Sequence, residues 1–170
     1  ALHFSTEAAV EHARLMWAEG ADIIDIGAES TRPGAEPVDA QQELARLLPV
    51  IEALKPLNVP LSIETFKPEV MQRVIDAGAD MINDIFGFRW PGAVQAVAQS
   101  RCGLCVMHMQ GEPRTMQTAP TYDDVVREVR EFLKGRVDAL LAAGVSRQRI
   151  LLDPGFGFGK TAAHNYHLLR

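Results

Sequence analysis

The 170-residue sequence predicts an α/β fold in which parallel β-strands alternate with amphipathic α-helices. Short apolar, β-branched runs recur along the chain, and segments with an apolar face at helical spacing separate them. Near-continuous apolar strands of this kind are typical of a parallel sheet covered by helices. No linker, low-complexity segment or second domain interrupts the pattern, so residues 1–170 are expected to form one domain.

Five apolar runs are expected to be the strands of this sheet. Three of them follow helical stretches that end at or near a glycine, namely Gly20, Gly78 and Gly144. Glycine suits that position because it adopts the left-handed conformation without strain. Another run is entered through Pro60. The runs cover residues 21–26, 61–65, 81–85, 104–108 and 150–153.

The helices between these strands carry start signals in the sequence. Asp39 can cap a helix with Gln42 at the capping-box position. Pro68 and Pro91 suit the first turn of a helix, where a missing N–H costs nothing. The segment 122–143 is expected to be the longest helix, with an apolar face. A second apolar face at helical spacing comprises Leu44, Leu47, Leu48, Ile51 and Leu54.

Polar residues at the strand ends favour a (βα)₈ TIM barrel over an open, doubly wound sheet. They are Asp25, Glu64, Asn83, His108 and Asp153. In a barrel the carboxyl ends of all strands form one ring, so these side chains would converge on a single site. A barrel of roughly 250 residues needs eight strands. The chain is therefore expected to be a partial barrel of about five βα units, strands 2–6, incomplete at both ends.

Composition excludes several classes of function. The net charge is −5 and Lys and Arg form no cluster, which argues against nucleic acid as a partner. No apolar run approaches the roughly 18 residues that cross a membrane, so no membrane association is expected. Cys102 and Cys105 are interpreted as ordinary buried thiols because their C-x-x-C spacing enters a strand. A cytoplasmic location fits such thiols.

Three polar or glycine-rich segments follow predicted strands, at residues 25–35, 107–117 and 153–161. In the last, Gly159-Lys160-Thr161 invites a nucleotide-binding P-loop interpretation. That motif needs its first glycine one residue earlier, where this chain has Pro154. Alternating glycines instead suit a loop that brings backbone, and Phe156 or Phe158, close to a flat ligand.

Together these segments resemble dihydropteroate synthase over almost the whole chain. The most specific stretches are residues 29–34, 82–85, 107–111 and 153–160. The resemblance implies a (βα)₈ barrel, usually dimeric, that joins 4-aminobenzoate to a 7,8-dihydropterin-6-ylmethyl diphosphate in folate biosynthesis. It also implies Mg²⁺ at the diphosphate, with its usual asparagine ligand outside this chain; no residue here is expected to bind metal. The family is a sulfonamide target.

Carried over by position, the resemblance implies that Glu64, Asn83 and Asp153 are the catalytic residues that hold the pterin ring. Asp25 and Phe156 are expected to support substrate binding. Thr31 and Arg32 are expected to contact the diphosphate and the aminobenzoate, since the guanidinium fork of arginine suits either anion. His108 is expected to be a core or supporting histidine rather than a ligand.

The chain departs from the family pattern at two positions. Glu64 replaces the usual aspartate, and its extra methylene is expected to tilt the pterin or weaken its binding. Ala28 replaces a usual glycine and would be strained if its φ were positive. The isolated 170 residues are expected to have negligible synthase activity. Two alternatives remain, a methyltetrahydrofolate-type pterin-binding methyltransferase and a non-catalytic partial copy.

Overall fold

The computed structural model describes residues 5–30 and 36–170, in which strands and helices alternate. The strands are β1 (Ile24–Gly27), β2 (Leu61–Glu64), β3 (Met81–Asp84), β4 (Gly103–Met107) and β5 (Ile150–Asp153). The helices are α1 (Thr6–Ala18), α2 (Ala40–Leu54), α3 (Pro68–Ala77), α4 (Ala93–Ala98), α5 (Val125–Ala142) and α6 (Ala162–Leu168). Two 3₁₀ turns, η1 (Lys55–Leu57) and η2 (Arg147–Arg149), precede β2 and β5.

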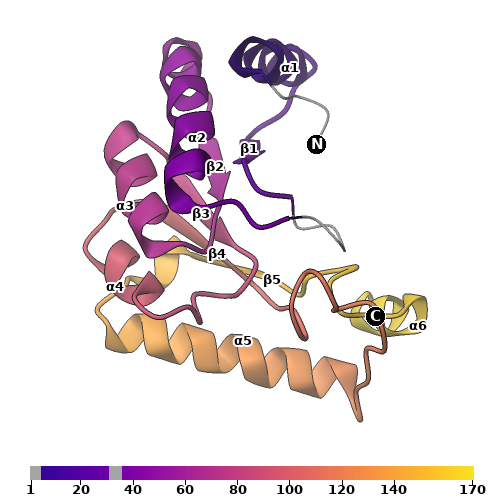
Figure 1. The fold of residues 1–170 in the computed structure, drawn as a ribbon. Helices are drawn as coiled ribbons and strands as arrows, with labels where there is room; N and C mark the ends of the chain where they lie inside the picture. The colour runs from indigo at the N-terminus through magenta and orange to yellow at the C-terminus, as the bar shows by residue number, and fades with distance from the viewer. Residues whose placement is uncertain (1–4, 31–35) are drawn as a thin grey trace.

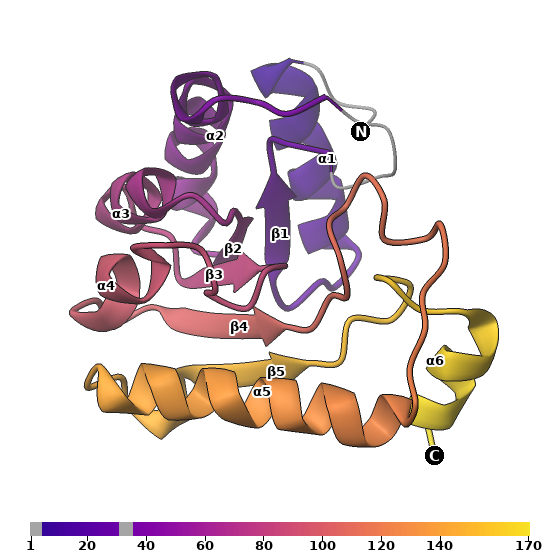
Figure 2. The same ribbon diagram turned by 60° about the horizontal axis from the view of Figure 1, so that its bottom comes forward.

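The five strands form one parallel sheet in the order β1-β2-β3-β4-β5. Helices α1 to α5 lie in an arc around one side of this curved sheet, and α6 lies beyond the carboxyl end of β5 (Figures 1 and 2). A doubly wound sheet would reverse its strand order and carry helices on both faces. Unbroken strand order with helices on one side is the geometry of a barrel wall, so the predicted partial (βα)₈ barrel is confirmed.

The core lies between the sheet and its helices. On β1 to β4 the face toward the helices is mostly apolar and buried, and the opposite face carries Asp25, Glu64 and Asn83. Because side chains alternate along a strand, this division follows from the sequence once the register is known. The buried strand residues of the core include Ile24, Leu61, Ile63, Ile82, Leu104 and Val106. From the helices, Leu47, Ile51, Leu54, Val70, Val74 and Leu140 pack against them.

The predicted helix starts hold at α2 and α3 and need correction at two others. Helix α5 begins at Val125, three residues later than expected, because Asp124 is its N-cap. Asp39 caps α2 by accepting a hydrogen bond from the backbone N–H of Gln42 at 2.8 Å, and Pro68 is the first residue of α3. Pro91, however, does not lie in the first turn of a helix. Gly92 occupies the N-cap of α4 with a φ of 88°, so the helix begins two residues later than expected. A left-handed residue cannot be part of the helix it precedes, and this sets the start.

The strands agree with prediction to within one residue at four of five positions, whereas β1 is shorter. It begins at Ile24 rather than Ala21, because the N–H of Ala21 bonds to the carbonyl of Met16 and completes the turn after α1. The predicted glycines all have positive φ: 101° at Gly20, 108° at Gly78 and 88° at Gly144. Within the described residues, no helix combines the length and apolar character needed to cross a membrane.

Candidate functional site

The register of the sheet places the polar strand residues in layers on its inner face. Gly27, Glu64, Asn83 and Cys105 lie side by side in one row across β1 to β4. Residues paired across parallel strands point to the same face, and those two positions away also share it. Asp25 therefore lies one layer below this row, and Asp153, paired with Met107, lies one layer above. The inner face thus gathers four predicted site residues, Asp25, Glu64, Asn83 and Asp153.

Asn83 is the centre of this group. Its side-chain Nδ2 donates a hydrogen bond to Asp25 Oδ2 at 3.3 Å. Its Oδ1 is buried and has no hydrogen-bond partner among the described residues. Buried polar atoms are almost always paired, and one left unpaired costs about 1–3 kcal/mol. The amide oxygen is therefore an acceptor available to a ligand that carries an N–H or O–H donor.

Glu64 has the most perturbed carboxyl group of the inner face. Burial, followed by the negative charge of Asp25, raises its pKa from 4.5 to about 7. The charges of Glu43, Glu29 and Asp84 act in the same direction. Near neutral pH this carboxyl group is poised between its acid and its anion, so it can donate or accept a hydrogen bond. Its side chain crosses the strand face above Gly27, where the missing side chain leaves room.

A buried charge cluster behind Glu64 was not predicted. Lys67 bonds to Glu29 and, at 2.6 Å, to Glu43, whose side chain is only 1% exposed. Glu29 follows β1, Glu43 belongs to α2, and Lys67 precedes α3, so the cluster joins two neighbouring βα units. The hydrogen bonds to the two glutamates raise the pKa of Lys67 despite its burial. A polar residue on the apolar face of α2 was the available sequence signal, at Glu43.

His108 does not join the inner face, which corrects the expectation that five polar strand ends converge. It follows β4 and points outward, where its ring meets the ring of Phe132 from α5 edge-on at 5.0 Å. Side-chain alternation places Met107 inside and His108 outside. Its expected role as a core histidine is confirmed, since it is buried and bonded to Lys160. Cys102 and Cys105 are buried free thiols, as predicted.

An apolar wall rises beside Asn83 and Asp153 at the carboxyl ends of the strands. It consists of Ile85, Met107, Met109 and Met116, with Phe86 and Phe158 packed against it. Flat, apolar ligands pack well against flexible methionine side chains. Phe158 belongs to this wall, whereas Phe156 is 43% exposed.

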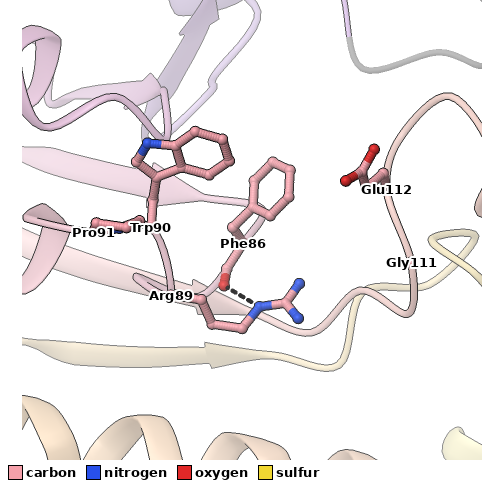
Figure 3. A pocket seen from close by; sticks show the side chains of 6 residues that line it. All are labelled: Phe86, Arg89, Trp90, Pro91, Gly111 and Glu112. Atoms are coloured by element: carbon pink, nitrogen blue, oxygen red, sulfur yellow. Dashed lines mark hydrogen bonds between the residues drawn. The ribbon is translucent and has the colours of Figure 1, made fainter.

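An open cleft of about 370 Å³ lies next to this wall, between the segments that follow β3 and β4 (Figure 3). Phe86, Arg89, Trp90 and Pro91 line one side, and Gly111 and Glu112 the other. The Nε of Arg89 donates to the carbonyl of Phe86 at 3.0 Å, which holds the guanidinium under the Phe86 ring. The rings of Phe66, Phe86 and Trp90 pack at centroid distances of 4.9–5.8 Å.

Asp84 was also missed from the sequence, although it directly follows Asn83. It points to the outer face, where it is fully buried and accepts hydrogen bonds from the N–H groups of Phe86 and Phe88 at 2.8 and 2.7 Å. Burial raises its pKa to about 6. It orders the turn after β3, in which Phe88 has a φ of 59°.

The remaining predictions concern the segment after β1. Thr31 and Arg32 lie outside the described residues. Ala28 does not have positive φ, so the expected strain is absent, and its carbonyl accepts a hydrogen bond from Arg46 at 2.8 Å. Across residues 5–30 and 36–170, no group of three or more His, Cys, Asp or Glu side chains could hold a metal ion.

Comparison with known proteins gives a consistent result. A family model described as "Pterin binding enzyme" matches residues 1–170. Dihydropteroate synthase of Escherichia coli is 49% identical over 168 residues, covering 98% of this chain and 60% of the relative. The chain thus spans about 60% of the length of this relative.

Solved structures agree with this result. Burkholderia cenocepacia dihydropteroate synthase complexed with 7,8-dihydropteroate matches with a TM-score of 0.91 and 59% identity, covering 97% of this chain and 60% of that one. The Yersinia pestis enzyme with a sulfonamide drug complex gives a TM-score of 0.95 at 47% identity, covering 98% and 61%. Since the family model covers every residue, the chain belongs to the pterin binding enzyme family.

Proposed function

We propose that this chain supplies the pterin site of a dihydropteroate synthase. The reaction condenses 7,8-dihydropterin-6-ylmethyl diphosphate with 4-aminobenzoate to give dihydropteroate and pyrophosphate. The observation that carries the proposal is the buried, unpartnered Oδ1 of Asn83, with Asp25 and Glu64 beside it on the inner face. The Burkholderia cenocepacia relative, 59% identical, binds 7,8-dihydropteroate.

The donor pattern of a pterin suits these acceptors. Its aminopyrimidine edge presents a row of N–H donors and one carbonyl. Asn83 Oδ1 and the carboxylate of Asp153 accept from that row, and Glu64 donates or accepts according to its protonation. Each pairing avoids the roughly 1–3 kcal/mol cost of an unsatisfied buried group. The apolar wall of Ile85, Met107 and Phe158 packs against the face of the ring system.

In the proposed reaction the bond between the pterin methylene carbon and the diphosphate oxygen breaks first, and its electron pair leaves with pyrophosphate. The amine nitrogen of 4-aminobenzoate then bonds to that carbon and loses a proton. The carboxylates of Asp25, Glu64 and Asp153 stabilise the positive charge that develops on the pterin. Thr31 and Arg32 keep their proposed role at the diphosphate and the aminobenzoate.

Three further properties of the whole enzyme belong to the proposal. Mg²⁺ accompanies the diphosphate. The enzyme acts as a homodimer and is located in the cytoplasm. Diphosphate binding measured with and without Mg²⁺ tests the first, and sedimentation tests the second.

Titration of the protein with 7,8-dihydropteroate tests the site. Asn83→Ala removes the buried acceptor, and we expect the affinity to fall by roughly tenfold or more. Asn58→Gly is the matched control: Asn58 lies at the amino end of β2, and glycine tolerates its φ of 52°. Its affinity should stay within about twofold of the parent. Equal binding by the parent and Asn83→Ala would refute the proposed site.

A second titration separates the synthase from the methyltransferase alternative. A synthase site binds pterin diphosphate in competition with dihydropteroate, and a sulfonamide competes with 4-aminobenzoate. Preferential binding of methyltetrahydrofolate, with no competition by the diphosphate, would favour the methyltransferase. Failure of every pterin to bind would favour a non-catalytic copy.

A further inference from the structure

Lys160 lies in the glycine-rich segment after β5, and its ammonium is buried without a carboxylate partner. The residue is 3% exposed, and it forms no ion pair among the described residues. Its Nζ lies 2.9 Å from His108 Nδ1, 2.9 Å from the Gly155 carbonyl, 3.0 Å from the Phe158 carbonyl and 3.3 Å from the His108 carbonyl. A phosphate would find no free donor there, so the P-loop interpretation fails on geometry as well as spacing.

The hydrogen bonds of Lys160 require a neutral His108. An ammonium has three N–H donors and no acceptor, so each of its partners must accept. Burial, followed by the charge of Lys160, lowers the pKa of His108 to about 4. At neutral pH the Nδ1 of His108 is therefore an acceptor and its proton is on Nε2. One cation thus joins the end of β4 to two carbonyls of the segment after β5.

Close backbone contact shows how tightly the two segments are joined. A Cβ added at Gly155 would lie 1.9 Å from the carbonyl oxygen of His108, and one added at Gly159 would lie 2.4 Å from that of Gln110. Only glycine permits this approach. The hydroxyl of Tyr122 adds a hydrogen bond to the Gly159 carbonyl at 2.7 Å. The segment 154–160 therefore packs on the segment that follows β4.

This packing sets the position of two groups at the inner face. Asp153 Oδ1 accepts a hydrogen bond from the N–H of Gly155 at 2.7 Å, which orients its carboxylate. Phe158 packs against the apolar wall of Ile85 and the methionines. Lys160 donates hydrogen bonds to the carbonyls of Gly155 and Phe158, the same two residues that make these contacts.

We propose that Lys160 is a positioning residue for the ligand site: by holding the segment 154–160 against β4 and His108, it fixes the carboxylate of Asp153 and the ring of Phe158. The inference deepens the proposed function, because the ligand whose affinity it controls is the pterin. Lys160 does not touch that ligand. Its role acts through Asp153, which lies above Asn83 on the same face.

Lys160→Met tests this role, since methionine fills much of the volume and removes all three donors. We expect amide hydrogen exchange of Gly155, Gly157 and Gly159 to accelerate roughly tenfold or more, because opening of the segment becomes easier. The affinity for 7,8-dihydropteroate should fall by about tenfold or more. The ring nitrogen chemical shift of His108 Nδ1 should move to that of an unbonded imidazole.

Val97→Ala is the control for a general loss of stability. Val97 is fully buried in α4, remote from the segment 154–160, and its truncation lowers the unfolding temperature without touching the site. We expect dihydropteroate affinity within about twofold of the parent for this variant. An equal affinity loss in both variants, or unchanged affinity in Lys160→Met, would overturn the positioning role. A parent protein that binds no pterin would instead overturn the proposed function, and hydrogen exchange would still show whether Lys160 holds the segment.

Discussion

The raised pKa of Glu64 predicts that this side chain destabilises the protein as the pH rises. Burial and the neighbouring charge of Asp25 raise the folded-state pKa from 4.5 to about 7. Below about pH 4.5 the group is protonated in both the folded and the unfolded state, and it costs nothing. Between about pH 4.5 and 7 the unfolded state loses its proton first, so folding becomes progressively less favourable. Above about pH 7 the full cost is present.

The magnitude follows from the size of the shift. About 2.5 pKa units at 1.36 kcal/mol each give roughly 3 kcal/mol. Glu64→Gln replaces the carboxyl group by a neutral group of the same shape that resembles the protonated form. We therefore expect Glu64→Gln to match the parent near pH 4.5 and to exceed its stability by roughly 3 kcal/mol near pH 8. For a chain of this length the unfolding temperature would rise by roughly 6–12 °C.

Urea unfolding of the parent and of Glu64→Gln between about pH 4.5 and 8 measures this difference. The control is Glu52→Gln, because the side chain of Glu52 is exposed. Asp80→Asn would be a poor control, because Asp80 accepts a hydrogen bond from the N–H of Leu61. Glu52 pairs with Lys55 at the surface, where such pairs contribute about 0–1 kcal/mol. A stability difference for Glu64→Gln that stays constant across the pH range would refute the reasoning, since only a titrating buried carboxyl group makes it grow.

Two further perturbations have matched controls. Gly155→Ala places a Cβ 1.9 Å from a backbone oxygen and should lower the free energy of unfolding by more than about 3 kcal/mol. In the control Gly157→Ala, no atom lies within 4 Å of the added Cβ. This variant should lose only about 1 kcal/mol, because alanine is strained at a φ of 80°. Equal losses in urea unfolding would contradict this. Lys67→Met leaves the buried carboxylate of Glu43 unpaired and should cost about 3–5 kcal/mol. Lys134→Met breaks an exposed pair and should cost less than about 1 kcal/mol; similar values for both would count against a buried charge cluster.

The sequence predicted most of the polar residues on the inner face, because the periodicity that marks a strand is a local property of the sequence. Apolar runs fixed where the strands lie, and the polar residue near each carboxyl end could be read directly, as at Glu64, Asn83 and Asp153. His108 shows the limit of that reading. Side chains alternate between the two faces of a strand, so the direction of a residue just past a strand can be assigned only when the register of that strand is known. The position of the strand end alone does not give the register.

Lys67, Asp84 and Lys160 were missed for a different reason. Each is an ordinary polar residue in a loop or at a strand end. The partners of the two lysines are far away in sequence: Lys67 meets Glu43, and Lys160 meets His108, 52 residues earlier. No spacing along the chain encodes such a contact. Asp84 has local partners, and its importance comes from its complete burial. Burial of these charges depends on how the loops fold over one another after the strands have paired.

By itself the sequence determined the alternation of strands and helices and the set of polar residues available for a ligand. These depend on periodicities of two and 3.6 residues and on local turn chemistry. Only the tertiary structure decided that the strands keep one order with helices on one side, that Asn83 retains an unpartnered buried oxygen, and that Glu64 titrates near neutrality. Those properties arise from burial and from charges brought together across strands, and both exist only once the chain has folded.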